Sequence, residues 1–377
     1  ISSLTHLPYR PSQSECALQA SDIEHLYLNE AENRLVFVDG HYSPELSKIV
    51  DQAALVIGNL PEFLSTHSAT LECHLGQYAT FENNVFSALN TAFLRDAALI
   101  LVPKNVSVTR PIHLLFIATQ QEVTSYPRCL LIGETGSNVT IIEDYVALQD
   151  ATYITNSVTE ISLAAKAHAR HIRVQRENTH AFHFANCAVS LAHASHYQSA
   201  SISLGSHISR YNLDVRLMDE AAECIIDGLT LISDRQLADT HTCIDHVKPN
   251  GTSHQQHKCI VDDSAHAVFN GKIIVRPHAQ RTNSSQSSRN LLLSSAAQID
   301  TKPQLEIFAD DVKCAHGATV GQLEQEEIFY LESRGLSELA ARNLFTYAFG
   351  AEIISRIPVT SLRQQLEQAV LNQTQGK

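Results

Sequence analysis

The chain has 377 residues, of which 44% are hydrophobic and 18% are charged, so it can bury a large core and is too apolar for a disordered protein. Its 27 Lys and Arg residues against 40 Asp and Glu residues give a formal net charge of −13. This acidic balance argues against non-specific binding to nucleic acid or to an anionic membrane. No apolar run reaches the roughly 18 residues that a membrane-spanning helix needs.

The cysteines and the N-terminal residues bear on where the protein works. Eight cysteines occur singly, and no two of them have Cys-x-x-Cys spacing. Ile1 begins a polar stretch with neither the basic nor the apolar region of a signal peptide. In a large acidic chain of this kind we expect reduced thiols and a cytoplasmic location. Because the chain lacks an initiator methionine, we also expect that residues before Ile1 have been removed.

Residues 1–96 are expected to form a mixed α/β segment. Residues 34–38 are rich in β-forming side chains and are followed by the turn dipeptide Asp39-Gly40, which predicts a short strand. Between residues 78 and 95 the apolar residues recur at helical spacing and predict a helix packed on the core. These apolar residues are Phe81, Val85, Leu89, Ala92 and Phe93.

Residues 97–321 form a long region of short alternating runs, which are typical of β-strands. Such runs lie at residues 139–142, 172–174, 202–204, 213–217, 259–261 and 273–275. The triplet Ala-His-Ala precedes a short β run three times, at Ala167, Ala192 and Ala265. Small residues followed by short strands suit a solenoid of stacked coils, with a β-sandwich as the alternative from the residues alone.

Residues 322–377 are expected to be helical. Ser337 is a candidate N-cap, and Pro358 should end the helix that it begins. Ser361 with Gln364 has the spacing of a capping box for a second helix, lined by Leu362, Leu366, Ala369 and Val370. The first helix carries two apolar stripes, which either pack on the β region and the last helix or leave one stripe free for a partner.

The junction between these regions holds the candidate metal ligands. Cys314 and His316 are two residues apart, so on a strand their side chains point to the same side and can meet one metal ion. A lone Cys-x-His is also compatible with a buried thiol beside a hydrogen-bonded imidazole. Two ligands do not complete a tetrahedral site, so a site here would need ligands from a second chain.

The stretch from Asp300 to Arg334 resembles the C-terminal signature of the SufB/SufD family, subunits of the cytosolic Suf iron–sulfur cluster assembly system. The resemblance rests on residues 300–307 and 310–321, where Gly317-Ala318-Thr319 after the histidine favours the SufD branch over the SufB branch. It extends to residues 34–40, 267–271 and 329–335 and so spans nearly the whole chain. Ala315 stands where the family usually has serine.

The resemblance implies a right-handed parallel β-helix core between the N-terminal α/β and C-terminal helical segments. It also implies a non-catalytic scaffold that pairs with SufB, or with itself when alone, and binds the ATPase SufC through the C-terminal helices. The helix residues proposed to contact SufC are Leu344, Phe345, Tyr347, Ala348 and Phe349. His316, with Cys314 as the second candidate, would contribute to a transient iron–sulfur cluster shared with SufB. Family complexes are associated with a reduced flavin, although the chain has no flavin motif.

Other chemistry is weakly indicated. The chain has no nucleotide-binding loop and no nucleophile or zinc-protease motif. Four His-x-x-His pairs would chelate a metal on a helix, but on a strand their two members point to opposite faces, so we expect mostly solvated or hydrogen-bonded histidines. The alternative functions are a β-helix polysaccharide lyase or hydrolase, which the absence of Trp and of clustered carboxylates disfavours, and a structural homo-oligomer.

Overall fold

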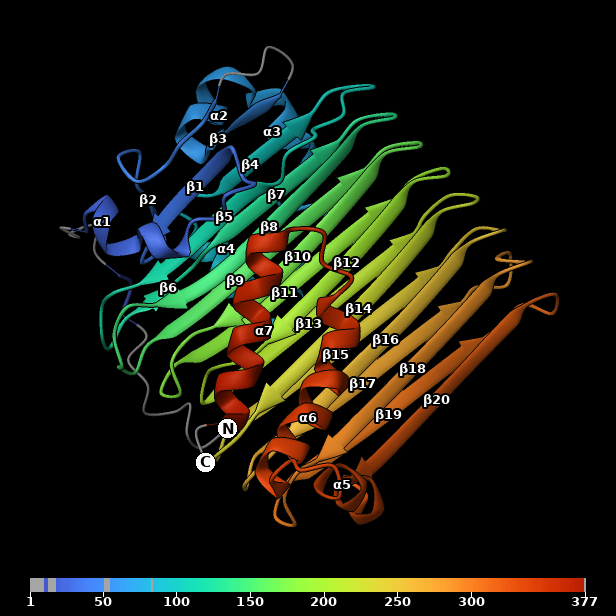
Figure 1. The fold of residues 1–377 in the computed structure, drawn as a ribbon. Helices are drawn as coiled ribbons and strands as arrows, with labels where there is room; N and C mark the ends of the chain where they lie inside the picture. The colour runs from blue at the N-terminus through green and yellow to red at the C-terminus, as the bar shows by residue number, and fades with distance from the viewer. Residues whose placement is uncertain (1–9, 13–17, 51–54, 83, 376–377) are drawn as a thin grey trace.

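The computed structural model describes residues 10–12, 18–50, 55–82 and 84–375. Two large sheets run along the molecule with a shared buried core between them, and the chain alternates from one sheet to the other (Figure 1). The first sheet has the order β2 (His41–Tyr42), β1 (Asn33–Val38), β5 (Ile112–Ala118), β8 (Asn138–Ala147), β10 (His168–Arg176), β12 (His196–Ser203), β14 (Glu223–Ile232), β16 (Thr252–Val261), β18 (Asn283–Leu292), β20 (Lys313–Gln322).

The second sheet has the order β19 (Gln298–Ile307), β17 (His266–Val275), β15 (Leu237–His246), β13 (Ile208–Leu217), β11 (Phe182–Leu191), β9 (Ile154–Leu163), β7 (Arg128–Gly133), β4 (Ala98–Val102), β3 (Val56–Asn59), and β6 (Thr124–Ser125) also pairs with β9. From β5 onward, neighbouring strands in both sheets are parallel. The parallel β-helix that the resemblance implies is therefore confirmed, and the β-sandwich is excluded. The expected boundaries at residues 96 and 321 stay a prediction.

The turns between the sheets explain the repeated small residues. A non-glycine residue with positive φ recurs about every thirty residues, at Lys166, Ala194, Ala221, Asn250 and Arg281. The backbone N–H of each donates a hydrogen bond to a carbonyl of the next coil, as from Lys166 to His193 and from Ala194 to Glu220. The fully buried alanines Ala167 and Ala222 lie at these corners, and Ala265 lies at a corresponding corner after Asp263, where a larger side chain would not fit.

The interior between the sheets changes character along the molecule. In the early coils it is filled by aliphatic and aromatic side chains such as Leu114, Phe116 and Ile141. In the last coils the side chains that point inward from β16 and β18 are mostly polar, and they are fully or almost fully buried. They comprise Ser253, Gln255, His257, Ser284, Gln286, Ser288 and Asn290.

The N-terminal segment adds helices to one end of the solenoid: α1 (Ala20–Ile23), the 3-10 helix η2 (Glu24–Leu26), α2 (Leu60–Thr66), α3 (Ser68–His74) and α4 (Val85–Ala92). The helix predicted for residues 78–95 begins only at Val85, after an N-cap by Asn84. The prediction of its buried face was wrong, because Phe81 and Val85 are exposed while Ser87 and Asn90 are buried. Asn90 donates to the carbonyls of Pro127 and Asn156, so polar anchoring to the sheet selects this face.

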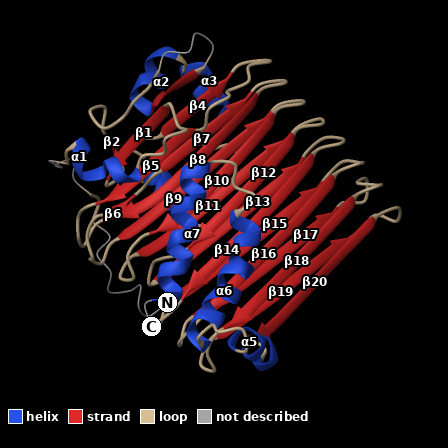
Figure 2. Cartoon of the chain, viewed as in Figure 1, coloured by secondary structure: helices blue, strands red, loops and turns tan. Residues whose placement is uncertain are grey.

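The C-terminal segment forms α5 (Gln325–Glu332), α6 (Glu338–Ile354) and α7 (Thr360–Gln375), and Figure 2 shows α6 and α7 lying across the strands. Ile353, Leu362 and Leu366 are fully buried in a cluster with aliphatic residues of the first sheet. Ser337 caps α6 as predicted, its hydroxyl accepting from the N–H of Ala340. The predicted cap at Ser361 was wrong: α7 begins at Thr360, and Ser361 donates to the carboxylate of Glu30.

Candidate functional site at the open end of the β-helix

The two sheets end at β19 and β20, each of which pairs with only one neighbouring strand in the described part of the chain (Figure 1). Each of these strands has 10 residues, so the last coil presents two long strand edges and its interior side chains at the end of the solenoid. Unpaired backbone N–H and C=O groups at such edges are ready to pair with another chain.

Cys314 and His316 lie on β20 at this open end. The strand is in register with β18, so that Cys314 is beside Ser284 and His316 is beside Gln286. Side chains at matching positions of neighbouring strands point to the same side of the sheet. Because Ser284 and Gln286 are buried in the interior, Cys314 and His316 belong to the same inward-facing rows. Their predicted placement on one side of a strand is therefore confirmed.

The two side chains differ in their surroundings. Cys314 is half-buried against the core, and burial raises the pKa of its thiol, opposed in part by a backbone hydrogen bond involving Ser284. The His316 side chain is exposed, because no further coil of the described chain covers it. A thiol and an imidazole that face one open space are ligands suited to iron once the thiol has lost its proton.

This chain supplies at most part of a metal site. Among the described residues, no three His, Cys, Asp or Glu side chains are grouped so that they could hold one metal ion. An iron centre at Cys314 and His316 would therefore take its remaining ligands from another molecule. Whether these two residues bind metal stays a prediction.

Three of the four His-x-x-His pairs combine one buried and one exposed histidine: His171, His183 and His257 are buried, whereas His168, His180 and His254 are exposed. In the fourth pair His193 is exposed in a turn and His196, at the start of β12, is partly exposed. Buried His171 contacts the Tyr197 hydroxyl and the Glu143 carboxylate, and buried His183 contacts Glu177. Stacked coils also align histidines from different turns, since the rings of His168 and His196 stack with centroids 5.6 Å apart.

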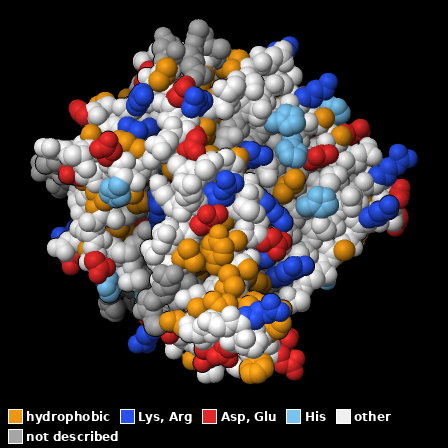
Figure 3. All heavy atoms as spheres, viewed as in Figure 1, with side chains coloured by type: hydrophobic (Ala, Val, Ile, Leu, Met, Phe, Trp, Pro, Cys, Tyr) orange, Lys and Arg blue, Asp and Glu red, His pale blue; other side chains and the backbone are white. Residues whose placement is uncertain are grey.

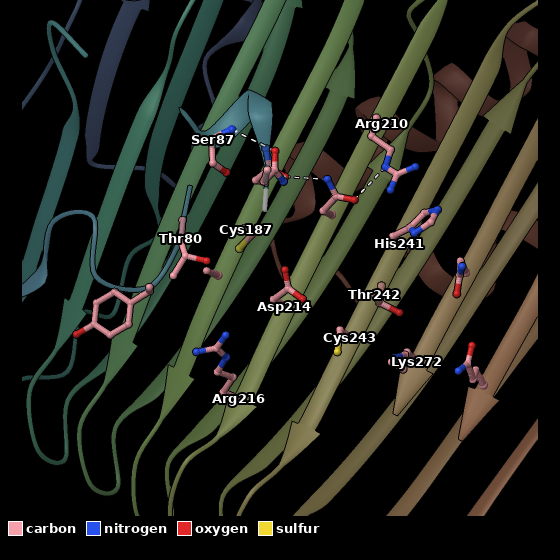
Figure 4. A pocket seen from close by; sticks show the side chains of 18 residues that line it. Thr80, Ser87, Cys187, Arg210, Asp214, Arg216, His241, Thr242, Cys243 and Lys272 are labelled. Atoms are coloured by element: carbon pink, nitrogen blue, oxygen red, sulfur yellow. Dashed lines mark hydrogen bonds between the residues drawn. The ribbon is translucent and has the colours of Figure 1, made fainter. Parts of the chain in front are cut away.

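A groove of about 530 Å³ on the outer face of the second sheet is a competing candidate (Figure 4). Its polar lining includes Arg210 and Lys272, but Arg210 is paired with Asp239 and Lys272 with Glu306. Burial raises the pKa of Cys243 in this groove to about 11, so its thiol is protonated at neutral pH. With Arg210 and Lys272 neutralised and the Cys243 thiol protonated, the groove is a weaker candidate than the open end.

The proposed partner-binding residues of α6 separate into two groups. Leu344 and Ala348 are exposed, whereas Tyr347 and Phe349 are half-buried against the cluster that joins α6 to the first sheet. Phe345 is half-buried. Apolar side chains gather over this part of the molecule in Figure 3. The exposed large apolar residues of the C-terminal helices and their connections are Phe329, Tyr330, Leu336, Leu339 and Leu344.

The interior neighbours of Cys314 and His316 were not found from the sequence. Residues 283–288 read Asn-Ser-Ser-Gln-Ser-Ser, so no alternation of apolar and polar residues marks which side faces inward. Only the pairing of β18 with β16 and β20 places Ser284 and Gln286 in the interior.

Family models match most of the chain. A model described as the SUF system FeS cluster assembly SufBD core domain matches residues 116–349, and one described as the SufBD protein N-terminal region matches residues 20–114. The first match covers the coils that lead to β20 and much of the C-terminal helical segment.

Several curated proteins are similar over most of the chain. A SufBD family iron–sulfur cluster assembly protein of Synechocystis is 42% identical over 94% of this chain and 81% of its own length. The iron–sulfur cluster assembly protein SufD of Escherichia coli is 36% identical over 88% of this chain and 77% of its own length. A chloroplastic protein of Arabidopsis thaliana is 32% identical over 75% of this chain and 61% of its own length.

Proposed function

The chain belongs to the SufBD family of the SUF iron–sulfur cluster assembly system, as a relative of SufD, and from this premise we propose that it is a non-catalytic scaffold subunit. It pairs with a SufB subunit through the open end of the β-helix and contributes His316, with Cys314 as the second candidate, to a nascent cluster. The cluster is transient cargo that both subunits share. The chain works in the cytoplasm.

The observation that carries this proposal is the position of Cys314 and His316 on the last coil. Their side chains face inward on a coil that no other described coil covers, beside two unpaired strand edges. A partner that pairs with β19 or β20 would enclose the two side chains and place its own ligands opposite them. The lack of a third metal ligand nearby in the described chain fits a site divided between subunits.

The C-terminal helices are the proposed docking surface for the ATPase SufC. Leu344 and Ala348 present an apolar surface to solvent, while Tyr347 and Phe349 hold α6 on the solenoid. Exposed apolar residues that continue onto α5, such as Phe329 and Tyr330, extend this surface.

In the described part of the chain, no helix is long and apolar enough to cross a membrane.

Anaerobic co-purification of the chain with SufB and SufC tests the scaffold proposal. We expect the wild-type chain to form a complex that contains iron and sulfide. The His316→Ala chain should form the same complex, but that complex should contain much less iron and sulfide. His254→Ala is the matched control, because His254 is exposed on the same sheet but faces its outer side and contacts Ser285. A wild-type chain that forms only a dimer with itself when SufB is present would contradict the proposed partnership.

The pH dependence of iron retention tests the role of Cys314. Ligation requires a thiolate, and the pKa of the Cys314 thiol is raised by burial, so binding must displace a proton. Iron retention should therefore strengthen as the pH rises, and Cys314→Ser should weaken that dependence. A profile that is the same in both proteins would remove Cys314 from the ligands and leave His316 as the candidate.

A further inference from the structure

A row of hydrogen-bonded polar side chains crosses the interior toward His316. Gln255 Nε2 donates to the Thr242 hydroxyl over 2.8 Å, and Gln286 Nε2 donates to Gln255 Oε1 over 2.7 Å. Gln255 is 3% and Gln286 is 2% exposed, so both amides are out of reach of bulk water. In this arrangement each amide nitrogen donates and the Gln255 oxygen accepts, so the donors of the row run in one direction, from Gln286 to Thr242.

The row ends with an oxygen that lacks a donor. Gln286 Oε1 is buried, and no described group donates a hydrogen bond to it. A buried carbonyl oxygen left without a partner costs roughly 1–3 kcal/mol, so it is a feature that requires an explanation. The fold makes room for this amide: a Cβ added to Gly271 on the opposite sheet would lie 2.3 Å from Gln286 Nε2.

The next side chain in the same interior row is that of His316. Gln286 on β18 and His316 on β20 are partners in the strand register, and their side chains point to the same side. The His316 imidazole is exposed at the open end, so it can turn its ring toward the row without displacing a packed neighbour. An imidazole N–H is the kind of donor that the unpaired amide oxygen needs.

We propose that Gln286 is a positioning residue for His316: its Oε1 accepts the N–H of one imidazole nitrogen and leaves the other nitrogen, unprotonated, facing the open end. Histidines that bind metals commonly donate their second N–H to a carbonyl or carboxylate, which selects the tautomer and orients the ring. The relevance to cluster binding rests on the proposed function, whereas the contact itself is a property of this chain.

Nitrogen NMR of the His316 ring in the full-length chain without metal tests the contact directly. The wild-type protein should show one dominant neutral tautomer with a slowly exchanging N–H. Gln286→Met, which keeps an unbranched side chain of similar length but has no carbonyl, should give a mixture of tautomers. Gln286→Glu retains an acceptor and should restore one tautomer.

Ser288→Ala is the matched control. Ser288 is fully buried on the same strand and the same interior face, but it is in register with Ala318 instead of His316. It should leave the His316 tautomer unchanged. In the anaerobic complex, we expect Gln286→Met to retain iron about 10-fold or more weakly than wild type, with Ser288→Ala close to wild type.

The outcomes separate this inference from the proposed function. Mixed tautomers in the wild-type chain, or the same tautomer in wild type and Gln286→Met, would overturn the contact whatever the iron content. If Gln286→Met does not fold, the wild-type spectrum still tests the contact, because mixed tautomers there would contradict it. Gln286→Glu should then show the same single tautomer as wild type. If the tautomer responds to Gln286 but His316→Ala keeps its iron and sulfide, the contact stands and the cluster role fails.

Discussion

Arg128 and Glu160 form an ion pair inside the fold, with Nη2 and Oε2 2.5 Å apart and both side chains no more than 1% exposed. The same carboxylate accepts hydrogen bonds from the backbone N–H groups of Gly76, Tyr78 and Ala79. Arg128 also donates to Asn90 on α4. The pair therefore attaches the N-terminal segment to strands β7 and β9 of the solenoid.

Replacing Glu160 by Gln should destabilise the chain strongly. The variant keeps the shape of the side chain but leaves the Arg128 guanidinium buried without a counter-charge, which typically costs about 3–5 kcal/mol. The free energy of unfolding in urea measures the effect. Glu32→Gln is the control, because Glu32 pairs with Arg110 at the surface and should cost less than about 1 kcal/mol. Equal losses in the two variants would show that the buried pair does not anchor the segment.

Gly228→Ala should be destabilising because the interior has no space for a methyl group there. A Cβ at Gly228 would lie 2.1 Å from Nδ1 of His257, whose ring stacks on Phe269. Overpacking of this kind costs about 1–3 kcal/mol. Gly317→Ala on β20 should be close to neutral in the isolated chain, because its Cβ would meet no atom within 4 Å. Thermal unfolding of both variants checks this, and the prediction fails if Gly317→Ala is the more damaging.

The stability of the chain should fall in mild acid partly because of His257. Burial lowers the pKa of His257 from 6.5 to about 4, so between these values the unfolded chain binds a proton that the folded chain does not. The free energy of unfolding therefore decreases as the pH falls through this window, by up to about 3 kcal/mol from this residue.

His257→Gln should remove this part of the pH dependence, because its side chain does not titrate. Urea unfolding at a series of pH values from 7 to 4 measures the slope. His193→Gln, a change at an exposed turn position, should retain the wild-type slope. A slope unaffected by His257→Gln would mean that the ring binds its proton equally in the folded and unfolded chains, so that burial does not lower its pKa.

Leu344→Asp should abolish co-purification with SufC while leaving the chain folded. Leu344 is 46% exposed on α6, so a charge there costs little stability, within about 0.5 kcal/mol, but disrupts an apolar interface. Leu64→Asp on α2 is the control, because Leu64 is 56% exposed and lies in the N-terminal segment. Retention of SufC by Leu344→Asp, or its loss from Leu64→Asp, would place the docking surface elsewhere.

The sequence predicted the features that depend on neighbouring residues. The alternating runs at residues 139–142 and 213–217 lie within β8 and β13, and Ser337 caps α6 as its place before the helix predicts. Leu362, Leu366 and Val370 are fully buried, as their helical spacing indicates. Strand periodicity, helix capping and amphipathic spacing act over a few residues, so they can be read along the chain.

Only the tertiary structure decided which groups from different coils meet. In a strand without apolar alternation, either set of alternate side chains could face the interior. The sequence of residues 283–288 therefore does not show that Ser284 and Gln286 lie inside, beside Cys314 and His316. Likewise, the buried face of α4 is set by carbonyls of Pro127 and Asn156 that Asn90 reaches across the fold. Contacts between coils join residues about thirty positions apart, and their partners exist only once the coils have stacked.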